Sequence, residues 1–205
     1  MVVIALISQK GGVGKSTLAQ ALAVEGSQQK LRVLLADYDP QQKTSCEWAK
    51  RRATKSKYLT VQGFNTFAEI TQQEKAYDLI VIDGPARTSQ GTLEIAKQAD
   101  LVIQPTGPSL ADLKPSVLEF HSLVKAGVDK AKLVFVLNHL STVNEEAAAR
   151  EYLAGAGYQV LTTGLKEKAS YRAVQNEGLS IGEVNYETLR RKVKELVKEI
   201  VGRVS

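Results

Sequence analysis

Short, continuously apolar segments recur along this chain, separated by longer segments in which apolar residues return every three or four positions. The apolar segments are rich in Val and Ile, which is typical of parallel strands covered on both faces. We expect strands at residues 2–7, 32–36, 79–82, 101–104 and 133–137, with weaker candidates at 59–61 and 160–161. Helical periodicity between them predicts helices that include residues 16–25, 118–125 and 145–153.

The alternation of strands with helices predicts an α/β fold: a doubly wound, mostly parallel sheet with helices on both faces. Thr142, followed three residues later by Glu145, has the pattern of a capping box and indicates a helix start. No linker, repeat or low-complexity tract interrupts the pattern, so we expect a single P-loop domain over residues 1–205. Ligands of such sheets bind beyond the carboxyl ends of the strands.

A glycine-rich loop follows the first strand and leads directly into a helix. Glycines let the backbone curl until successive N–H groups point at one anion, and the helix N-terminus adds partial positive charge. A lysine that reaches the β- and γ-phosphates and a serine that ligates Mg²⁺ complete a P-loop. The residues expected to bind ATP are Gly11, Gly12, Val13, Gly14, Lys15, Ser16 and Thr17.

Acidic residues close two of the expected strands. Alternation along the first of these strands predicts Asp37 and Asp39 on one face, beside the phosphates. Asp83 follows four apolar residues in a Walker B segment at residues 77–86, and we expect it to hold Mg²⁺ through a water. We also expect Gly84 to leave its backbone N–H free for the γ-phosphate. For Asp37, a water-mediated Mg²⁺ contact and a structural role stay open.

The loop departs from the common P-loop form, because Gln9 stands where the first glycine is usual and Lys10 adds a second lysine. With this deviant Walker A string and the segment Asp37-Tyr38-Asp39-Pro40-Gln41, the chain resembles the ParA/MinD family of ATPases. The resemblance implies an ATP-sandwich homodimer in which Lys10 acts in trans. It further implies that Asp39 orients the attacking water, that Asn138 reads adenine and that residues 104–113 lie at the dimer face. Catalysis would then rest on Lys10, Lys15 and Asp39.

The chain has 205 residues, a formal net charge of +5 and one cysteine, Cys46, which cannot form an internal disulfide. We expect a cytoplasmic protein, and its length resembles the short ParA-type partition proteins. That resemblance implies a dimer that binds DNA without sequence preference, associates with the nucleoid, and is released when a cargo-binding adaptor protein stimulates hydrolysis. The candidate DNA contacts are Lys166, Lys168, Arg172, Arg190, Arg191, Lys192, Lys194 and Lys198.

Two other functions stay open at this point. The apolar stripe of the expected last helix, residues 186–204, suits packing on the domain, but it also suits a membrane-surface helix of a MinD-like septum-positioning ATPase. We expect packing, and hence no membrane partner. The second alternative is a metabolic P-loop enzyme such as dethiobiotin synthetase. It would need a pocket for a small substrate, for which the sequence offers no constellation of residues.

Overall fold

The computed structural model describes residues 1–85 and 90–204 and contains a seven-stranded sheet, with the strand order β3-β2-β4-β1-β5-β6-β7. Every pair of neighbouring strands is parallel, as the sequence predicts for a doubly wound sheet. The strands are β1 (Val2–Leu6), β2 (Val33–Asp37), β3 (Leu59–Gly63), β4 (Leu79–Asp83), β5 (Leu101–Thr106), β6 (Leu133–Leu137) and β7 (Gln159–Val160).

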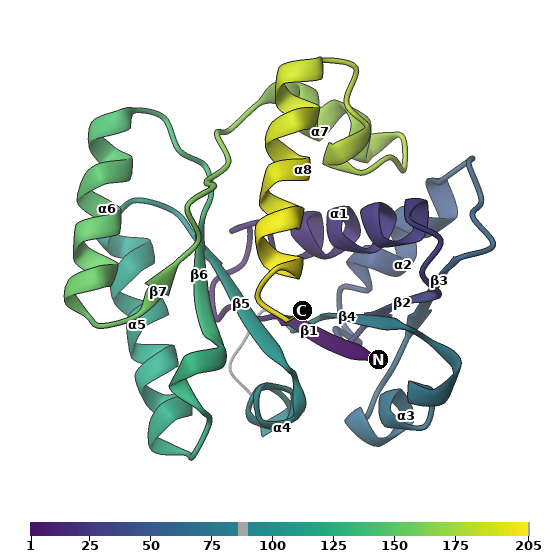
Figure 1. Ribbon diagram of the computed structural model, residues 1–205, viewed down its shortest axis with the longest axis horizontal. Helices are drawn as coiled ribbons and strands as arrows, with labels where there is room; N and C mark the ends of the chain where they lie inside the picture. The colour runs from purple at the N-terminus through teal and green to yellow at the C-terminus, as the bar shows by residue number, and fades with distance from the viewer. Residues whose placement is uncertain (86–89, 205) are drawn as a thin grey trace.

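Helices connect the strands and cover both faces of the sheet (Figure 1). They are α1 (Lys15–Gln28), α2 (Thr44–Arg51), α3 (Phe67–Thr71), α4 (Gln90–Gln98), α5 (Leu110–Lys125), α6 (Val143–Gly155), α7 (Ala169–Asn176) and α8 (Glu187–Val201), with 3-10 turns at Glu74–Ala76, Lys130–Lys132 and Ile181–Glu183. The capping box predicted at Thr142 begins α6 as expected. In the described ranges, no helix is long and apolar enough to cross a bilayer.

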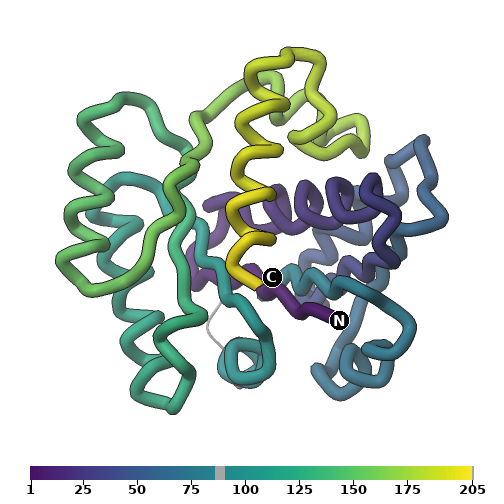
Figure 2. The backbone as a smooth tube through the Cα atoms, viewed as in Figure 1, coloured from purple at the N-terminus to yellow at the C-terminus, as the bar shows by residue number. Residues whose placement is uncertain are grey.

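Two separate apolar cores form because successive residues of each strand point to opposite faces of the sheet. On one face, Val3 and Ala5 of β1 pack with α3, α4, α5 and α6. On the other face, Ile4 and Leu6 pack with α1, α2, α7 and α8. Figure 2 shows α8, in yellow, crossing α1, in purple, and the two helices are in contact. The second core therefore fixes the helix that follows the glycine loop.

Helix α5 is longer than the sequence predicted, because it begins at Leu110 and has Pro115 inside it. Proline lacks a backbone N–H and is unfavourable inside a helix, but Pro115 lies in the second turn of α5, upstream of the segment 118–125 that the sequence predicted as helical. The first turn is secured instead by the Ser109 carbonyl, which accepts from the N–H groups of Asp112 and Leu113 at 2.9 Å. The extra turns matter for function because they bring Asp112 next to the glycine loop.

Candidate nucleotide-binding site

The glycine loop crosses from the end of β1 to the start of α1 with two glycines in left-handed conformations. Gly12 has φ of 78° and Gly14 has φ of 98°, which side chains with a Cβ rarely adopt. A Cβ on Gly14 would lie 2.1 Å from Nδ2 of Asn138, so both the conformation and the space require glycine there. The predicted loop, Gly11 to Thr17, therefore has the curled backbone that phosphate binding needs.

Side chains from two distant elements hold this loop. Nδ2 of Asn138, just after β6, donates to the Val13 carbonyl at 2.9 Å, and its Oδ1 accepts from the His139 N–H. Glu119 on α5 is buried and accepts from the Gln9 N–H at 3.0 Å. Buried hydrogen bonds of this kind fix backbone groups in one arrangement. The predicted contact of Asn138 with adenine remains a prediction, and the structure adds a role for this side chain in shaping the loop.

Lys15 is buried at the first turn of α1. Burial lowers the pKa of its ammonium group, whereas the carboxylates of Asp83, Asp39 and Glu119 oppose that lowering. A lysine surrounded by acids stays charged more readily than an isolated buried one. The arrangement therefore offers a cation at the position where the sequence predicts a contact with the β- and γ-phosphates.

Asp83 ends β4 next to Lys15 and is 2% exposed. The Ser45 hydroxyl donates to its Oδ2 at 2.7 Å, while its Oδ1 is buried with no hydrogen-bond partner among the described residues. Burial raises the pKa of Asp83 to about 6, and the hydroxyls of Ser45 and Ser16 oppose the rise. A buried oxygen without a partner, close to a serine hydroxyl, is a suitable anchor for a hydrated cation.

This donor set fits magnesium better than a protein-caged metal. No group of three or more His, Cys, Asp and Glu side chains that could hold a metal ion occurs in residues 1–85 and 90–204. Mg²⁺ at phosphate sites keeps several waters and takes one or two protein ligands together with phosphate oxygens. Ser16 and Asp83 would supply the protein share, and their contact with Mg²⁺ stays a prediction.

The two aspartates at the end of β2 do not share a strand face, which corrects the prediction. The strand ends at Asp37, so the alternation that would pair it with Asp39 stops there. Both carboxylate oxygens of Asp37 accept from backbone N–H groups, of Asp39 at 3.2 Å and of Cys46 at 2.9 Å. These contacts favour the structural alternative for Asp37 over the water-mediated Mg²⁺ contact.

Asp39 lies in the loop that follows β2, where its Oδ1 accepts from the N–H groups of Gln41 at 3.1 Å and Gln42 at 3.0 Å. Its negative charge acts on Lys15. The side chain thus belongs to the loop between β2 and α2 and lies within electrostatic reach of the phosphate position. Orientation of the attacking water by Asp39 stays a prediction.

Gly84 also differs from the prediction. Its N–H is not free for a phosphate, because it donates to the Leu6 carbonyl at 3.0 Å. A Cβ at this position would lie 2.6 Å from that carbonyl oxygen, so glycine allows β4 to continue close against β1. The predicted Walker B segment ends at Ala86, which lies outside the described residues.

Lys10 lies at the surface and does not line the cavity beside its own loop. Its ammonium group pairs with Asp112 at the start of α5, and its side chain is 46% exposed. Ser109 donates to the same carboxylate at 2.6 Å. A Cβ on Gly107 would lie 2.5 Å from Asp112 Oδ2, so the segment between β5 and α5 is shaped around this pair. The second lysine is therefore held outside the cavity described next.

A cavity of about 390 Å³ opens over the loop and is large enough for a nucleotide. Its lining includes Asn138 and the predicted loop residues Gly11, Gly12, Gly14, Lys15, Ser16 and Thr17. Val13, also predicted to bind the nucleotide, is buried and does not line the cavity. The sequence did not identify its far wall, which comes from the segment after β7 and from α7. The lining residues missed in this wall are Leu165, Glu167, Tyr171 and Gln175. Further lining residues that the sequence did not identify are Gln42 and Thr44 around the start of α2, His139 after β6 and Ile181 after α7. Lys166, Lys168 and Arg172, predicted as DNA contacts, line the same cavity.

A curled glycine loop between a parallel strand and a helix, with a buried lysine and an aspartate on the adjacent strand, defines a P-loop nucleotide-binding protein. Residues 4–181 match the family model described as "CobQ/CobB/MinD/ParA nucleotide binding domain". The chain belongs to this family, and it is an ATPase.

Curated relatives and solved structures agree with this assignment. The chain is 29% identical over 181 residues to "Maintenance of carboxysome distribution protein A" of Gloeobacter kilaueensis, covering 87% of this chain and 83% of that protein. It is 25% identical over 199 residues to the "Chromosome-partitioning ATPase Soj" of Treponema pallidum, covering 95% and 75%. The structure of the septum site-determining protein MinD from Pyrococcus horikoshii, complexed with Mg-ADP, superposes with a TM-score of 0.72 at 19% identity, covering 100% and 98%.

Proposed function

We propose that this protein is a ParA-type positioning ATPase that forms an ATP-dependent homodimer, binds DNA without sequence preference and is released when an adaptor protein stimulates hydrolysis. The observation that carries the dimer is the exposed Lys10, held at Asp112 outside its own nucleotide cavity. A lysine that served the phosphates of its own chain would be expected to line the cavity, as the buried Lys15 does.

Magnesium and ATP belong to the same proposal. The match to a MinD structure that holds Mg-ADP supports a magnesium nucleotide in this family. In this chain, Ser16 and Asp83 would hold the cation. Its positive charge would offset the negative charge that develops on the phosphates during hydrolysis. Lys15 would position the β- and γ-phosphates, and Asp39 would orient water. Lys10 of the facing subunit would stabilise the transferred phosphoryl group.

Dimerisation would require Lys10 to leave Asp112. Because the pair is exposed, its contribution to stability is small, about 1 kcal/mol or less, and a triphosphate on a second copy could replace it. Lys10→Ala should therefore bind ATP as a monomer but fail to dimerise, and size-exclusion chromatography with ATP and with ADP measures this. Lys125→Ala, which removes a lysine at the far end of α5, is the matched control. An ATP-dependent dimer of Lys10→Ala with normal turnover would remove the trans role.

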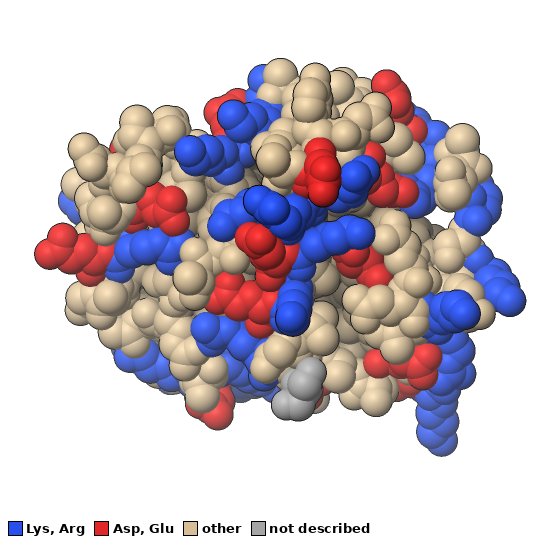
Figure 3. All heavy atoms as spheres, turned by 45° about the horizontal axis from the view of Figure 1, so that its top comes forward, with Lys and Arg blue, Asp and Glu red and all other residues tan. Residues whose placement is uncertain are grey.

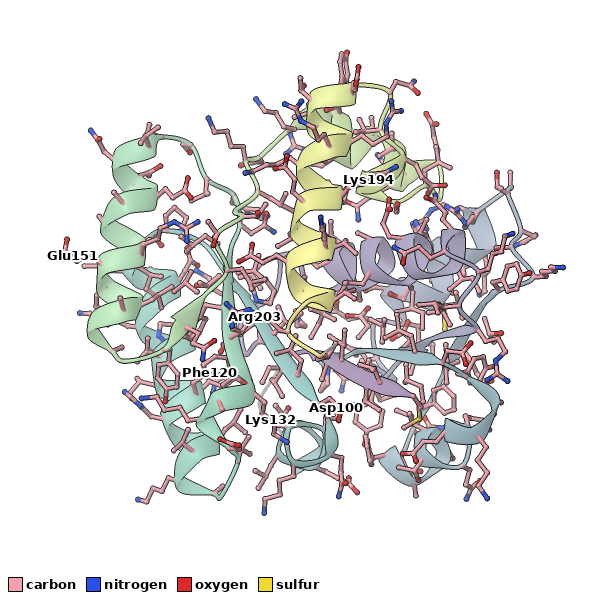
Figure 4. The ribbon with its side chains drawn as sticks, in the orientation of Figure 1. Asp100, Phe120, Lys132, Glu151, Lys194 and Arg203 are labelled. Atoms are coloured by element: carbon pink, nitrogen blue, oxygen red, sulfur yellow. The ribbon has the colours of Figure 1, made fainter. Side chains whose placement is uncertain are left out.

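Basic residues on α8 support the DNA part of the proposal. Figure 3, which turns the top of Figure 1 toward the viewer, shows Lys and Arg side chains gathered across this face with acidic residues among them. Arg191 and Lys198 are exposed on α8, and Figure 4 labels Lys194 on the same helix. Lysines and arginines of this kind bind phosphates with no sequence preference. Two copies in a dimer would raise the affinity through effective concentration.

The proposal separates these α8 residues from the basic residues that line the nucleotide cavity. Arg191→Ala/Lys198→Ala should leave ATP affinity unchanged and lower the slope of log affinity against log salt by about one for each DNA phosphate that the protein no longer neutralises. Lys55→Ala/Lys57→Ala, in the exposed segment between α2 and β3, is the matched control. Equal DNA affinity and equal salt slope for the two double variants would refute the assignment of α8.

A MinD-like membrane function has less support. The apolar stripe of α8 is occupied in packing, because Val193 and Ile200 are 0% exposed against the core that also covers α1. A helix that lies on a membrane needs such a stripe free. Flotation with anionic liposomes and ATP tests the choice, and clear capture of the protein by liposomes would favour the membrane alternative.

The cargo follows from the relatives only as a class. One relative is named for carboxysome distribution and another for chromosome partitioning, so the names of similar chains cover two kinds of cargo. We therefore propose cargo positioning as the function and an adaptor protein on the cargo as the partner. Slow basal ATP hydrolysis that rises with DNA and adaptor would support this, whereas stoichiometric consumption of ATP with a metabolite would indicate a metabolic enzyme.

A further inference from the structure

A chain of hydrogen-bonded polar side chains leads from Asp83, through the buried Ser45 and Gln20, to the half-buried Gln175 on α7. The Ser45 hydroxyl donates to Asp83 Oδ2 at 2.7 Å, and Gln20 Nε2 on α1 lies 3.4 Å from the Ser45 oxygen. Gln175 Nε2 on α7 reaches Gln20 Oε1 at 3.2 Å and Thr17 Oγ1 at 2.9 Å. Four separate elements thus contribute to one hydrogen-bonded line that ends at the proposed magnesium carboxylate.

Burial of this hydrogen-bonded line makes the loss of a hydrogen bond among its buried members costly. Ser45 is 0% exposed, Gln20 is 1% exposed and Asp83 is 2% exposed, so water cannot replace a lost partner easily. In such an environment, removing one group leaves its neighbour without a hydrogen-bond partner, which is costly. The bond between Gln20 and Ser45 is long and is the weakest link, while the bond between Ser45 and Asp83 is short and strong.

Ser45 differs from the other groups around Asp83 because it determines which carboxylate oxygen stays available. It occupies Oδ2 and leaves Oδ1 as the oxygen without a hydrogen-bond partner among the described residues. Ser45 itself lies in the first turn of α2, directly after the loop that contains Asp39. The position of this hydroxyl is therefore set by the end of the β2–α2 loop on one side and by Gln20 on the other.

We propose that Ser45 is a positioning residue that orients the Asp83 carboxylate for magnesium, and that Gln20 and Gln175 hold Ser45 in place from α1 and α7. This inference rests on the proposed magnesium site. Groups that orient a metal ligand commonly change metal affinity by 10- to 100-fold when removed, although they never touch the metal. The line also connects α7, a wall of the nucleotide cavity, to the same carboxylate.

The test compares Ser45→Ala with wild type in the binding of a fluorescent, non-hydrolysable ATP analogue. Affinity is measured once with EDTA and once over a magnesium series, so the effect on nucleotide binding is measured separately from the effect on magnesium binding. Ser27→Ala is the matched control, because Ser27 is a buried serine whose hydroxyl donates only within α1, to the Val24 carbonyl at 2.8 Å. Thermal melting confirms that all variants are folded.

For Ser45→Ala, we expect affinity in EDTA to change less than about twofold. The magnesium concentration for half-maximal tightening should rise about 10-fold or more. Gln175→Ala should move the same magnesium midpoint roughly two- to tenfold, since it acts through one neutral hydrogen bond further along the line. For the double variant Ser45→Ala/Gln175→Ala, the free-energy change in magnesium binding should be smaller than the sum of the two single changes, because both substitutions act on one network.

Three results would overturn the inference, and they are distinguishable. An unchanged magnesium midpoint in Ser45→Ala would show that the hydroxyl does not orient Asp83. An equal loss of affinity for the analogue in EDTA and in magnesium would show that Ser45 has a general structural role. A wild-type protein whose affinity for the analogue does not depend on magnesium would instead refute the proposed magnesium site itself, on which the positioning role depends.

Discussion

Replacing Asp83 with asparagine removes a charge whose burial the fold tolerates at a cost. Burial raises the pKa of Asp83 from its ordinary value of 3.8 to about 6. A carboxyl group whose pKa is higher in the folded than in the unfolded state stabilises the fold fully below pH 3.8, and that stability is lost as the pH rises through about 6. The whole change corresponds to roughly 3 kcal/mol of unfolding free energy.

The assay is urea unfolding of wild type and Asp83→Asn in EDTA without nucleotide, at about pH 4 and about pH 7. Between these two pH values, wild type should lose roughly 2 kcal/mol more stability than the variant. Comparing the change between the two pH values cancels any fixed packing cost of the new amide. The variant should also lose the magnesium dependence of ATP binding, because a neutral amide is a poor magnesium ligand.

Asp37→Asn is the matched control, since Asp37 is also 2% exposed and pairs in register with Asp83 on the adjacent strand. Both oxygens of Asp37 accept backbone N–H groups, so one amide N–H of the variant would face another N–H. We expect about 1–3 kcal/mol of destabilisation there. If the free energy of unfolding of Asp83→Asn changes between the two pH values as much as that of wild type, then the buried charge of Asp83 does not destabilise the fold and the reasoning is wrong.

Three further predictions concern contacts around the site. Arg52→Ala breaks a buried ion pair with Glu183, whose N–O distances are 2.6 and 2.7 Å, and should cost about 3–5 kcal/mol in urea unfolding; a loss below about 1 kcal/mol would contradict this. Asn138→Ala frees the Val13 carbonyl and should weaken ATP binding roughly tenfold in fluorescence titrations, whereas unchanged affinity would show that the loop holds its shape alone. Asp39→Ala should bind ATP and accumulate as a dimer on sizing columns, and a purely monomeric variant would exclude a role limited to hydrolysis.

Much of this architecture could be predicted because it depends on local patterns. Continuous apolar segments located every strand, and the glycine loop with Lys15 and Ser16 located the site at the carboxyl edge of the sheet. These signals are local, because strand burial, glycine conformations and helix capping can each be predicted from residues that are close together in the sequence. The extent of the elements was less well predicted, because the helical segment recognised at residues 118–125 is only the second half of α5, which begins at Leu110.

The features that were missed or wrong depend on contacts between residues far apart in the sequence. Whether Asp39 shares a face with Asp37 depends on where β2 stops, and β2 stops at Asp37. The N–H of Gly84 is occupied by a carbonyl of β1, which only the strand order brings near. Asn138 reaches the glycine loop across 125 positions of sequence, so its role in shaping the loop has no local signature.

The central claim is that a bound triphosphate turns this ATPase into a DNA-binding dimer. The most direct measurement is DNA binding with ADP, with ATP and with a non-hydrolysable ATP analogue, each over a series of salt concentrations. We predict that the protein binds DNA only with the two triphosphates and that this affinity falls steeply with salt. The strongest DNA binding is expected with the non-hydrolysable analogue. Equal binding with ADP, or no binding with any nucleotide, would contradict the claim.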